Sequence, residues 1–433
     1  MKGMIILKGM FTMNELKRIT VIQSVVDGIR TQKEAAKILK LSDRQIRKIV
    51  KRFKEEGPEG IKHKNKNYKP VHTLSNELKE KIIQLKLSDD YSNTNFSHFR
   101  DLLEERENIK ISYSALYNIL NNNHITSKKA HKCKKTHRRR KRKEAEGLLV
   151  QTDGTPFDWF NIGKKYSLHG YIDDATGKIL GLYMCENECL MGYLEITRQM
   201  LKKYGSPIAI YSDKYSVFFP TSYQKVTIEE ELKGKLKPTT QFHRIMDFLG
   251  IELIAASTSQ AKGRIERLWE TLQDRLVTEF KINHITTIEE ANKFLPKYIE
   301  KYNKKFAIEP ENKNSKFVPI PSYIDLDILL SNKLTRVIDS AGTFTINNKR
   351  FQIVNNNILP NVKVNIYISH KIGIIVEYKE KRYKVICIDN VPISYSNLNF
   401  TKLCKDHELE VKEFATNLCS YNSKELAPLL TTS

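Results

Sequence analysis

The first periodic pattern along the chain is helical and lies between residues 14 and 60. Two stretches in it, "TQKEAAKIL" and "SDRQIRKIVKRF", each open on a hydroxyl residue that is followed three positions later by Glu or Gln. This is the capping box that begins many helices. Only two residues separate the stretches, and Ile46, Val50 and Phe53 fall on one face of the second. We therefore predict a helix-turn-helix DNA-binding domain over residues 14–60.

A second helical region follows a polar stretch, "KHKNKNYKP". Helical patterns over residues 75–87, 95–107 and 112–121 resemble another helix-turn-helix, and we predict a second DNA-binding domain over residues 72–125. The signal for DNA is weaker here, because the last of these helices carries no Lys or Arg.

Residues 126–147 are predicted to be a basic linker. Within them, residues 128–143 hold 11 Lys or Arg in 16 positions. Such a dense run of like charges repels itself, so we expect a tether that follows phosphates rather than a folded element.

From Leu148 the pattern changes to alternating strands and helices. Three strand patterns in succession are followed by helix, strand, helix, strand and a long helix over about residues 260–280. An amphipathic helix over residues 284–310 then opens on Thr287 with Glu290. This order predicts an α/β core of helices against a mixed sheet over residues 148–310, compatible with a ribonuclease-H-like fold.

The last patterned region alternates at period two. "RVIDSAGTFTINNKRFQIV", "VKVNIYIS" and "IGIIVEYKEKRYKVICID" have Asn, Gly and Lys at their turns. A small β-barrel over residues 330–395 is the simplest closed arrangement of such strands. The predicted fold class is thus multidomain, with an all-α N-terminal part, a central α/β core and this barrel.

The charge of the chain is concentrated at one end. The whole chain has a formal charge of +23, and residues 1–147 hold 35 basic and 17 acidic side chains, a net of +18. This favours a polyanionic partner for the N-terminal third. On the second helix of the first domain the outward positions could enter a major groove, although a solvated basic face is the alternative; they are Arg44, Gln45, Arg47, Lys48, Lys51 and Arg52.

Composition narrows the class of protein further. A hydrophobic fraction of 40% is enough for packed cores, and no apolar run approaches the roughly 20 residues that span a bilayer. An anionic membrane surface could also attract the basic end of the chain, but we expect DNA and no membrane as the partner. The six cysteines show no CxxC spacing. We expect a protein of the reducing cytoplasm, associated with the nucleoid.

Three carboxylates stand at the ends of predicted elements. Asp153 lies at the end of the first strand, Asp213 ends the fourth strand, and Glu266 lies early in the long helix. Side chains at the carboxyl edge of an α/β sheet converge over a crevice. Three carboxylates there suit Mg²⁺, and two ions could serve phosphoryl transfer. Each acid could instead be a turn former or a surface residue, and Asp158 is a rival; "DDATG", with two further acids, is better explained as a β-turn.

Several stretches together resemble the DDE transposases of bacterial insertion sequences, most closely the ISNCY group, which is related to retroviral integrases. They are "VQTDGTPFDWF", "YIDDATGKILGLYM", "AIYSDKYSVF", "SQAKGRIER" with "TLQDRL", and "ANKFLPKYIEKYNKKFAIEP". The resemblance covers nearly the whole chain. It implies that Asp153, Asp213 and Glu266 are the catalytic acids and ligands of two Mg²⁺ ions, for which Mn²⁺ may substitute.

The resemblance also implies the reaction and the partners. The enzyme would bind the terminal inverted repeats of its element, cleave the 3′ end and join it to target DNA. Its partners would be double-stranded DNA, at the element ends and at the target, and further copies of itself. Two alternative functions remain for this chain: a DNA-binding regulator with an inactive core, and a nuclease of the same fold that does not join ends.

Some positions depart from the family pattern. Phe157 and "NIGKK" stand where a His and an acidic-Gly-Arg segment are expected, and Gln273 stands where a basic residue is common. Asp213 and Glu266 are 53 residues apart, which we attribute to a loop insertion at "TSYQKVTIEEELKGKLKP". Lys262 and Arg264 are predicted phosphate contacts, with helix capping or solvation as the alternative.

Overall fold

The computed structural model describes residues 11–61, 74–127, 140–220, 239–256, 262–347, 349–354, 358, 360–388 and 411–417. Most of the predicted basic linker, the whole predicted loop insertion at 221–238 and the end of the predicted barrel lie outside these residues. The chain divides into two compact units, Met1–Ile83 and Gln84–Ser433.

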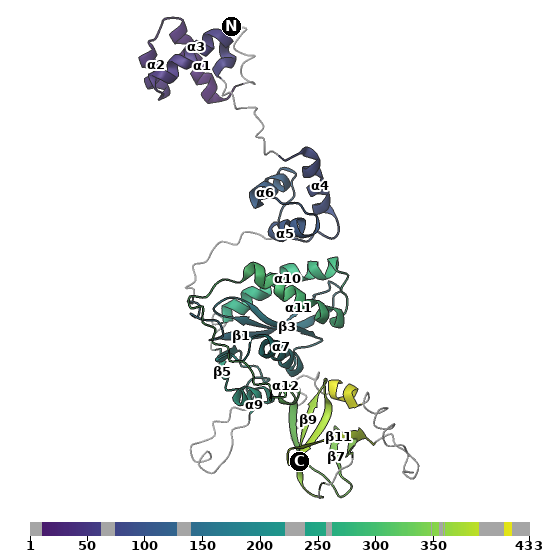
Figure 1. The fold of residues 1–433 in the computed structure, drawn as a ribbon. Coiled ribbons are helices and arrows are strands. Elements are labelled where there is room, and N and C mark those ends of the chain that lie inside the picture. Colours follow the sequence, from purple (N-terminus) through teal and green to yellow (C-terminus); the bar gives the residue numbers. More distant parts are fainter. Residues whose placement is uncertain are drawn as a thin grey trace. The chain divides into compact units, whose positions relative to one another are not determined.

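The first unit contains the predicted helix-turn-helix (Figure 1). Its helices are α1 (Met13–Val26), α2 (Gln32–Leu39) and α3 (Asp43–Glu56), followed by the 3-10 helix η2 (Gly57–Ile61). Both predicted capping boxes are present, at Thr31 and at Ser42, and α1 has a third at Thr12. Lys40 takes the left-handed conformation, which lets the chain reverse within two residues. Ile46, Val50 and Phe53 are buried as predicted.

The next three helices agree with the predicted patterns to within one or two residues. They are α4 (Asn76–Leu87), α5 (Phe96–Arg106) and α6 (Tyr113–Asn122). Side chains of Asn95 and Ser112 cap α5 and α6. Buried residues include Phe99, Leu102 and Leu116.

A five-stranded mixed sheet forms the centre of the second unit, with strand order β3-β2-β1-β4-β5. β1, β2 and β3 are antiparallel neighbours, whereas β4 and β5 run parallel to β1. The predicted ribonuclease-H-like α/β core is therefore confirmed. In chain order the elements are β1 (Val150–Phe157), β2 (Tyr166–Asp173), β3 (Ile179–Cys185), α7 (Leu190–Lys203), β4 (Ala209–Ser212), α9 (Gln241–Phe248), β5 (Glu252–Ala255), α10 (Gly263–Ile282) and α11 (Ile288–Phe306).

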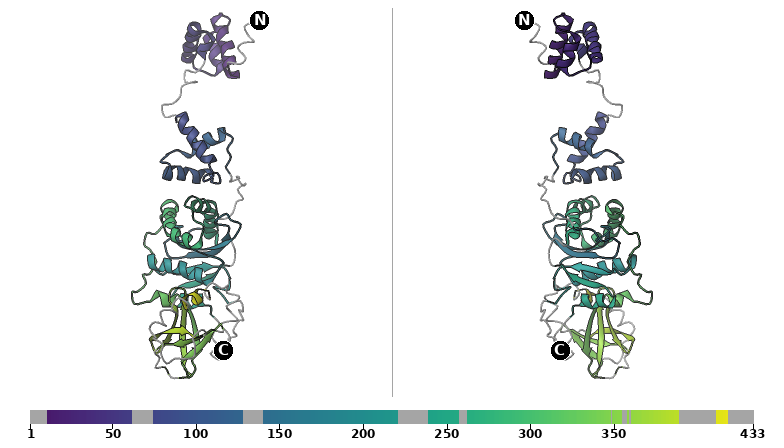
Figure 2. Two further views of the ribbon diagram at one scale, coloured as in Figure 1. Left: turned by 90° about the vertical axis from the view of Figure 1, so that its right-hand side faces the viewer. Right: turned by 90° about the vertical axis from the view of Figure 1, so that its left-hand side faces the viewer.

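Helices cover both faces of this sheet (Figure 1, Figure 2). Side chains of α10 and α11 pack with Leu168 and Ile172 of β2 in one hydrophobic cluster. Side chains of α7 and α9 pack with Tyr171 of β2 in another. Because successive residues of a strand point to opposite faces, one strand supplies both cores.

Two element ends differ from the prediction. β1 does not end at Asp153 but runs on to Phe157, because its antiparallel pairing with β2 continues to the pair Phe157 and Tyr166. Its parallel pairing with β4 covers only Val150 and Gln151. α11 ends at Phe306 rather than near residue 310, since Ala307 is already extended.

The C-terminal strands form one antiparallel sheet of six, in the order β6-β9-β10-β11-β8-β7. The sheet encloses a single apolar core that also includes Val411 and Ala415 of a short helical stretch, so the predicted barrel is confirmed as a barrel-like sheet. Its elements, preceded by α12 (Leu326–Leu329), are β6 (Asn332–Val337), β7 (Thr343–Ile346), β8 (Lys349–Ile353), β9 (Lys363–Ser369), β10 (Gly373–Tyr378) and β11 (Lys381–Cys387). Among the described helices of the chain, none has the length and apolar character needed to cross a membrane.

Candidate active site

The start of α10 is fixed to β1 by one side chain. Gln151 accepts hydrogen bonds through Oε1 from the backbone amides of Arg264 (3.3 Å) and Ile265 (3.2 Å). The first amides of a helix lack partners within the helix, so this amide group caps α10 from a neighbouring strand. Gln151 in turn donates to Asp174 at 2.9 Å. The residue that caps α10, Gln151, thus lies two positions before Asp153 in β1.

Lys262, at the N-cap of α10, brings two of the predicted catalytic acids together. Its Nζ lies 2.8 Å from Asp153 Oδ1 and 3.6 Å from Asp213 Oδ2. Asp153 lies two residues beyond Gln151, the last residue of β1 that pairs with β4, and Asp213 follows the last residue of β4. The carboxylates therefore meet at the edge where β4 ends, with one ammonium group between them.

The environment of Asp153 acts on its pKa in both directions. Burial raises the pKa of Asp153, and the ammonium group of Lys262 lowers it. Asp213 raises the pKa, and the Trp269 indole, which donates to Oδ2 at 3.3 Å, lowers it. The net direction is upward. A carboxylate that is buried and faces a second carboxylate is stabilised by a cation.

Glu266 lies on the face of α10 that is turned toward β1. Lys262 and Trp269 on this face contact Asp153, and Gln273 donates to the Thr155 hydroxyl at 3.4 Å. Successive residues of an α-helix are rotated by about 100°, so Glu266 lies within about 60° of all three of these positions. Its side chain is exposed. The third predicted acid is thus an exposed residue on the helix face that also carries Lys262 and Trp269.

The rival acids have structural roles. Asp158 accepts hydrogen bonds from the amides of Ile162 (3.0 Å) and Gly163 (2.8 Å), which close the loop after β1. Asp173 accepts from the amide (2.8 Å) and the hydroxyl (2.7 Å) of Thr176, as expected of a β-turn. The buried Asp174 pairs with Arg140.

The predicted DNA contacts lie in two settings. Lys262 is 8% exposed and is bound to the aspartates, while Arg264 lies 3.6 Å from Asp174 and donates to the carbonyl of Arg140. On α3 the predicted groove-facing side chains are exposed, with Arg52 half-buried; the exposed ones are Arg44, Gln45, Arg47, Lys48 and Lys51. The Oε1 atom of Gln45 also accepts from the Ser42 amide in the capping box.

One acidic residue near the site was missed in the sequence. Glu188 lies between β3 and α7, and the buried Tyr193 hydroxyl donates to its Oε1 at 2.5 Å. Burial raises the pKa of Glu188 to about 7; the Tyr193 hydroxyl lowers it, whereas Asp153 and Asp213 raise it. Glu186 is also a glutamate in the segment between β3 and α7, so the sequence pattern does not distinguish it from Glu188.

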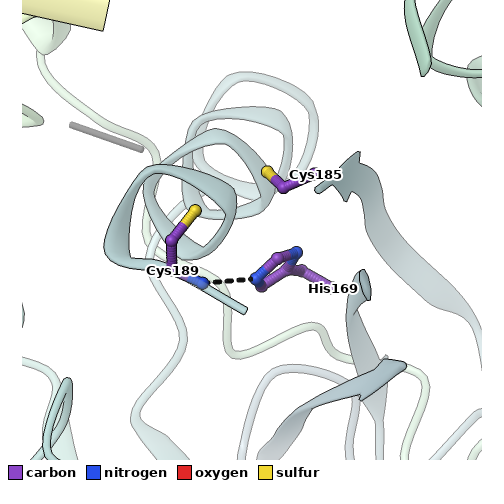
Figure 3. A group of neighbouring side chains, drawn as sticks. All are labelled: His169, Cys185 and Cys189. Carbon is purple, nitrogen blue, oxygen red and sulfur yellow. Dashed lines mark hydrogen bonds between the residues drawn. The ribbon is translucent and has the colours of Figure 1, made fainter. Parts of the chain in front are cut away.

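A buried group of His169, Cys185 and Cys189 lies beneath the start of α7 (Figure 3). His169 Nε2 accepts from the Cys189 amide at 3.2 Å, so the ring proton is on Nδ1, 3.2 Å from the carbonyl oxygen of Tyr183. Burial lowers the pKa of His169 to about 4. Both ring nitrogens are engaged by backbone groups. In this arrangement His169 therefore holds the start of α7 in place and does not serve as a metal ligand.

Comparison with known proteins identifies the family. The chain is 34% identical over 369 residues to the transposase for insertion sequence IS1202 of Streptococcus pneumoniae, covering 78% of this chain and 77% of that protein. It belongs to the insertion-sequence transposases. A second relative of this transposase is y4bF of Sinorhizobium fredii, which is provisionally described as a transposase and is 32% identical over 81% of this chain and 75% of its own length.

Two further comparisons concern parts of the transposase. The family described as "Helix-turn-helix domain" matches residues 17–69, which confirms the first predicted domain type. Among solved structures, the catalytic core domain of HTLV-2 integrase in complex with magnesium is 16% identical, covers 39% of this chain and 94% of its own, and has a TM-score of 0.27. A simian T-cell lymphotropic virus intasome chain is 13% identical over 70% of this chain and 95% of its own, with a TM-score of 0.29.

The neutral His169 predicts a pH dependence of stability in the core. Its pKa is about 4 in the folded chain, against 6.5 for the unperturbed group. Between these values the unfolded chain binds a proton that the folded chain does not, so the free energy of unfolding falls as the pH falls. The loss is at most about 1.4 kcal/mol per pH unit.

His169→Gln removes this contribution and should flatten the decline in unfolding free energy between about pH 7 and pH 5. Urea unfolding followed by tryptophan fluorescence measures it, because both tryptophans of the chain, Trp159 and Trp269, lie in one core cluster. The exposed His124→Gln is the control. Equal pH slopes for His169→Gln and the wild type would contradict the assignment.

Proposed function

We propose that this transposase uses Asp153, Asp213 and Glu266 for Mg²⁺-dependent cleavage at the 3′ ends of its element and for joining those ends to target DNA. It would recognise the element through terminal inverted repeats bound by residues 14 to about 125. The proposal combines the family of the chain with the arrangement of charges around Lys262.

The position of the Lys262 ammonium group is the observation that carries the proposal. Asp153 and Asp213 come from separate elements, yet one cation contacts both, at 2.8 and 3.6 Å. Carboxylate oxygens are the ligands that Mg²⁺ prefers, and Mg²⁺ shares its coordination shell readily with phosphate. The donor set therefore fits a divalent cation, and we propose that these two acids and Glu266 hold two Mg²⁺ ions, with Mn²⁺ as a substitute.

When bound, such ions supply an activated attacking oxygen and stabilise the leaving oxygen of an in-line displacement. The protein's own groups orient the acids. Trp269 donates to Oδ2 of Asp153 and so restrains the rotation of that carboxylate. Gln151 fixes the first turn of α10, which sets the position of Glu266 over β1. Lys262, released from the aspartates, is placed to contact a DNA phosphate.

The N-terminal helices supply the recognition surface in this proposal. Arg44, Arg47, Lys48 and Lys51 are exposed on α3, opposite its buried apolar stripe. This arrangement suits a recognition helix with early residues at base edges and later residues at phosphates. Joining requires two element ends to be held together, so we propose that several copies assemble on double-stranded DNA of the nucleoid.

Replacing the acids tests the catalytic proposal. Asp153→Asn and Glu266→Gln should each reduce strand joining by more than about a hundredfold, because a neutral amide is a poor ligand for a hard cation. The assay uses a duplex that carries the element end, a target duplex and Mg²⁺. Glu270→Gln, an exposed acid one turn farther along α10, should retain joining.

Three outcomes distinguish the candidate functions in that assay. Joining by the wild type supports the transposase reaction, cleavage without joining indicates a nuclease, and binding alone indicates a regulator with an inactive core. Full joining activity in Asp153→Asn or Glu266→Gln would contradict the assignment of the acids.

The helix-turn-helix proposal predicts a change in salt dependence. Lys48→Ala combined with Arg52→Ala should lower the magnitude of the slope of log K against log salt by about 2, because each lost phosphate contact removes about 0.9. Fluorescence anisotropy on an element-end duplex measures the slope. Lys17→Ala with Arg18→Ala removes the same charge from exposed positions of α1 and is the control. A slope equal to that of the wild type would place the phosphate contacts elsewhere.

A further inference from the structure

We propose that Glu188 is a fourth acidic group of the active site, a positioning residue held by Tyr193 that strengthens the binding of divalent cations at Asp153 and Asp213. This inference rests on the proposed function. It assigns a role to a residue that belongs to none of the three predicted catalytic positions.

The Glu188 side chain lies against the strand that carries Asp153. A Cβ atom at Gly154 would lie 2.9 Å from both Cγ and Cδ of Glu188. Cβ atoms in proteins essentially never come this close to another heavy atom that is not bonded to them. The absence of a side chain at Gly154 therefore leaves the space that the carboxyl group fills. Glu188 thus lies against Gly154, the residue next to Asp153, although Gly154 and Glu188 are 34 positions apart in the sequence.

Tyr193 fixes the Glu188 carboxyl group through a hydrogen bond. Its hydroxyl donates to Glu188 Oε1, and the same hydroxyl oxygen would lie 3.0 Å from a Cβ on Gly154. The tyrosine ring is itself immobilised, since it is fully buried and its centroid lies 4.6 Å from that of Phe218. A buried phenol with one defined partner holds a carboxyl group in a single orientation.

The main chain beside Glu188 is clamped as well. The next residue, Cys189, donates its amide to His169 Nε2, as Figure 3 shows. His169 is anchored in β2 and packs so tightly on α7 that any Cβ on Gly192 would lie 2.4 Å from its ring. Backbone, side chain and neighbouring strand therefore all fix the position of Glu188.

The charges around this point favour a divalent cation. Asp153, Asp213 and Glu188 influence one another electrostatically, and Lys262 is the ammonium group that acts on all three. Three carboxyl groups beside one ammonium group leave negative charge in excess, and clustered carboxylates are stabilised when a cation binds. Residues around the ligands that do not bind the metal themselves also affect the affinity of a metal site, and their mutation typically costs ten- to a hundredfold.

Glu186 provides a matched control in the same link between β3 and α7. It is exposed, and its carboxylate pairs with the exposed Lys164 at 3.3 Å. Glu186→Gln and Glu188→Gln thus remove the same charge two residues apart, one at the surface and one against Gly154.

The experiment titrates Mn²⁺ into the full-length protein without DNA and follows binding by calorimetry. Glu188→Gln should raise the Kd for Mn²⁺ about tenfold, Tyr193→Phe should raise it by less, and Glu186→Gln should leave it unchanged. Thermal unfolding in EDTA checks that Glu188→Gln is folded. Its Tm should equal or exceed that of the wild type, because one of three repelling carboxylates is gone.

Joining activity supplies the second readout. Saturating Mn²⁺ should restore joining in Glu188→Gln but not in Asp153→Asn. A Kd for Glu188→Gln equal to that of Glu186→Gln would overturn the inference and leave the proposed function standing. Loss of all Mn²⁺ binding in Glu188→Gln would overturn the positioning role, since it would make Glu188 a direct ligand. Absence of Mn²⁺ binding and of joining in the wild type would overturn the proposed function itself.

Discussion

The ion pairs between Lys262 and the aspartates Asp153 and Asp213 are the interaction on which the rest of the site depends. Three elements distant in sequence supply these groups: β1, the residue after β4, and the start of α10. Two carboxylates placed this close repel each other, so the folded chain tolerates them because a cation lies between them. In the proposed function the same constraint gives Lys262 a role: its ammonium group would neutralise the acids until a divalent cation takes its place.

The surrounding fold serves to hold that arrangement. The pairing of β1 with β4 stops after Gln151, which leaves the β4 side of the strand unpaired at Asp153, while the pairing with β2 continues to Phe157. Gln151 anchors α10, and the cluster of α10 and α11 side chains on the sheet keeps the helix in place. On the opposite face, α7 is clamped at its start by His169. The candidate site is therefore built mainly from regular elements, which hold side chains in more precise positions than loops do.

Local patterns predicted much of this structure. The capping boxes at Thr31, Ser42 and Thr287 were visible because their partners are three residues apart, and the strand and helix periods of the core were equally local. The end of β1 was misplaced because it depends on how far β2 pairs with it. The contacts of Lys262 and the location of Glu188 were not predictable, since both arise from residues brought together by the sheet. The sequence could nominate the three acids by type and position, but only the fold places a lysine between two of them.

The most direct test of this account is anomalous diffraction from crystals of the protein grown with Mn²⁺. The account predicts a manganese peak coordinated by both Asp153 and Asp213, with the Lys262 side chain moved away from the two carboxylates. Crystals grown in EDTA should show Lys262 between the aspartates. A structure in which Lys262 stays on both aspartates at saturating Mn²⁺, with manganese bound elsewhere or not at all, would contradict it.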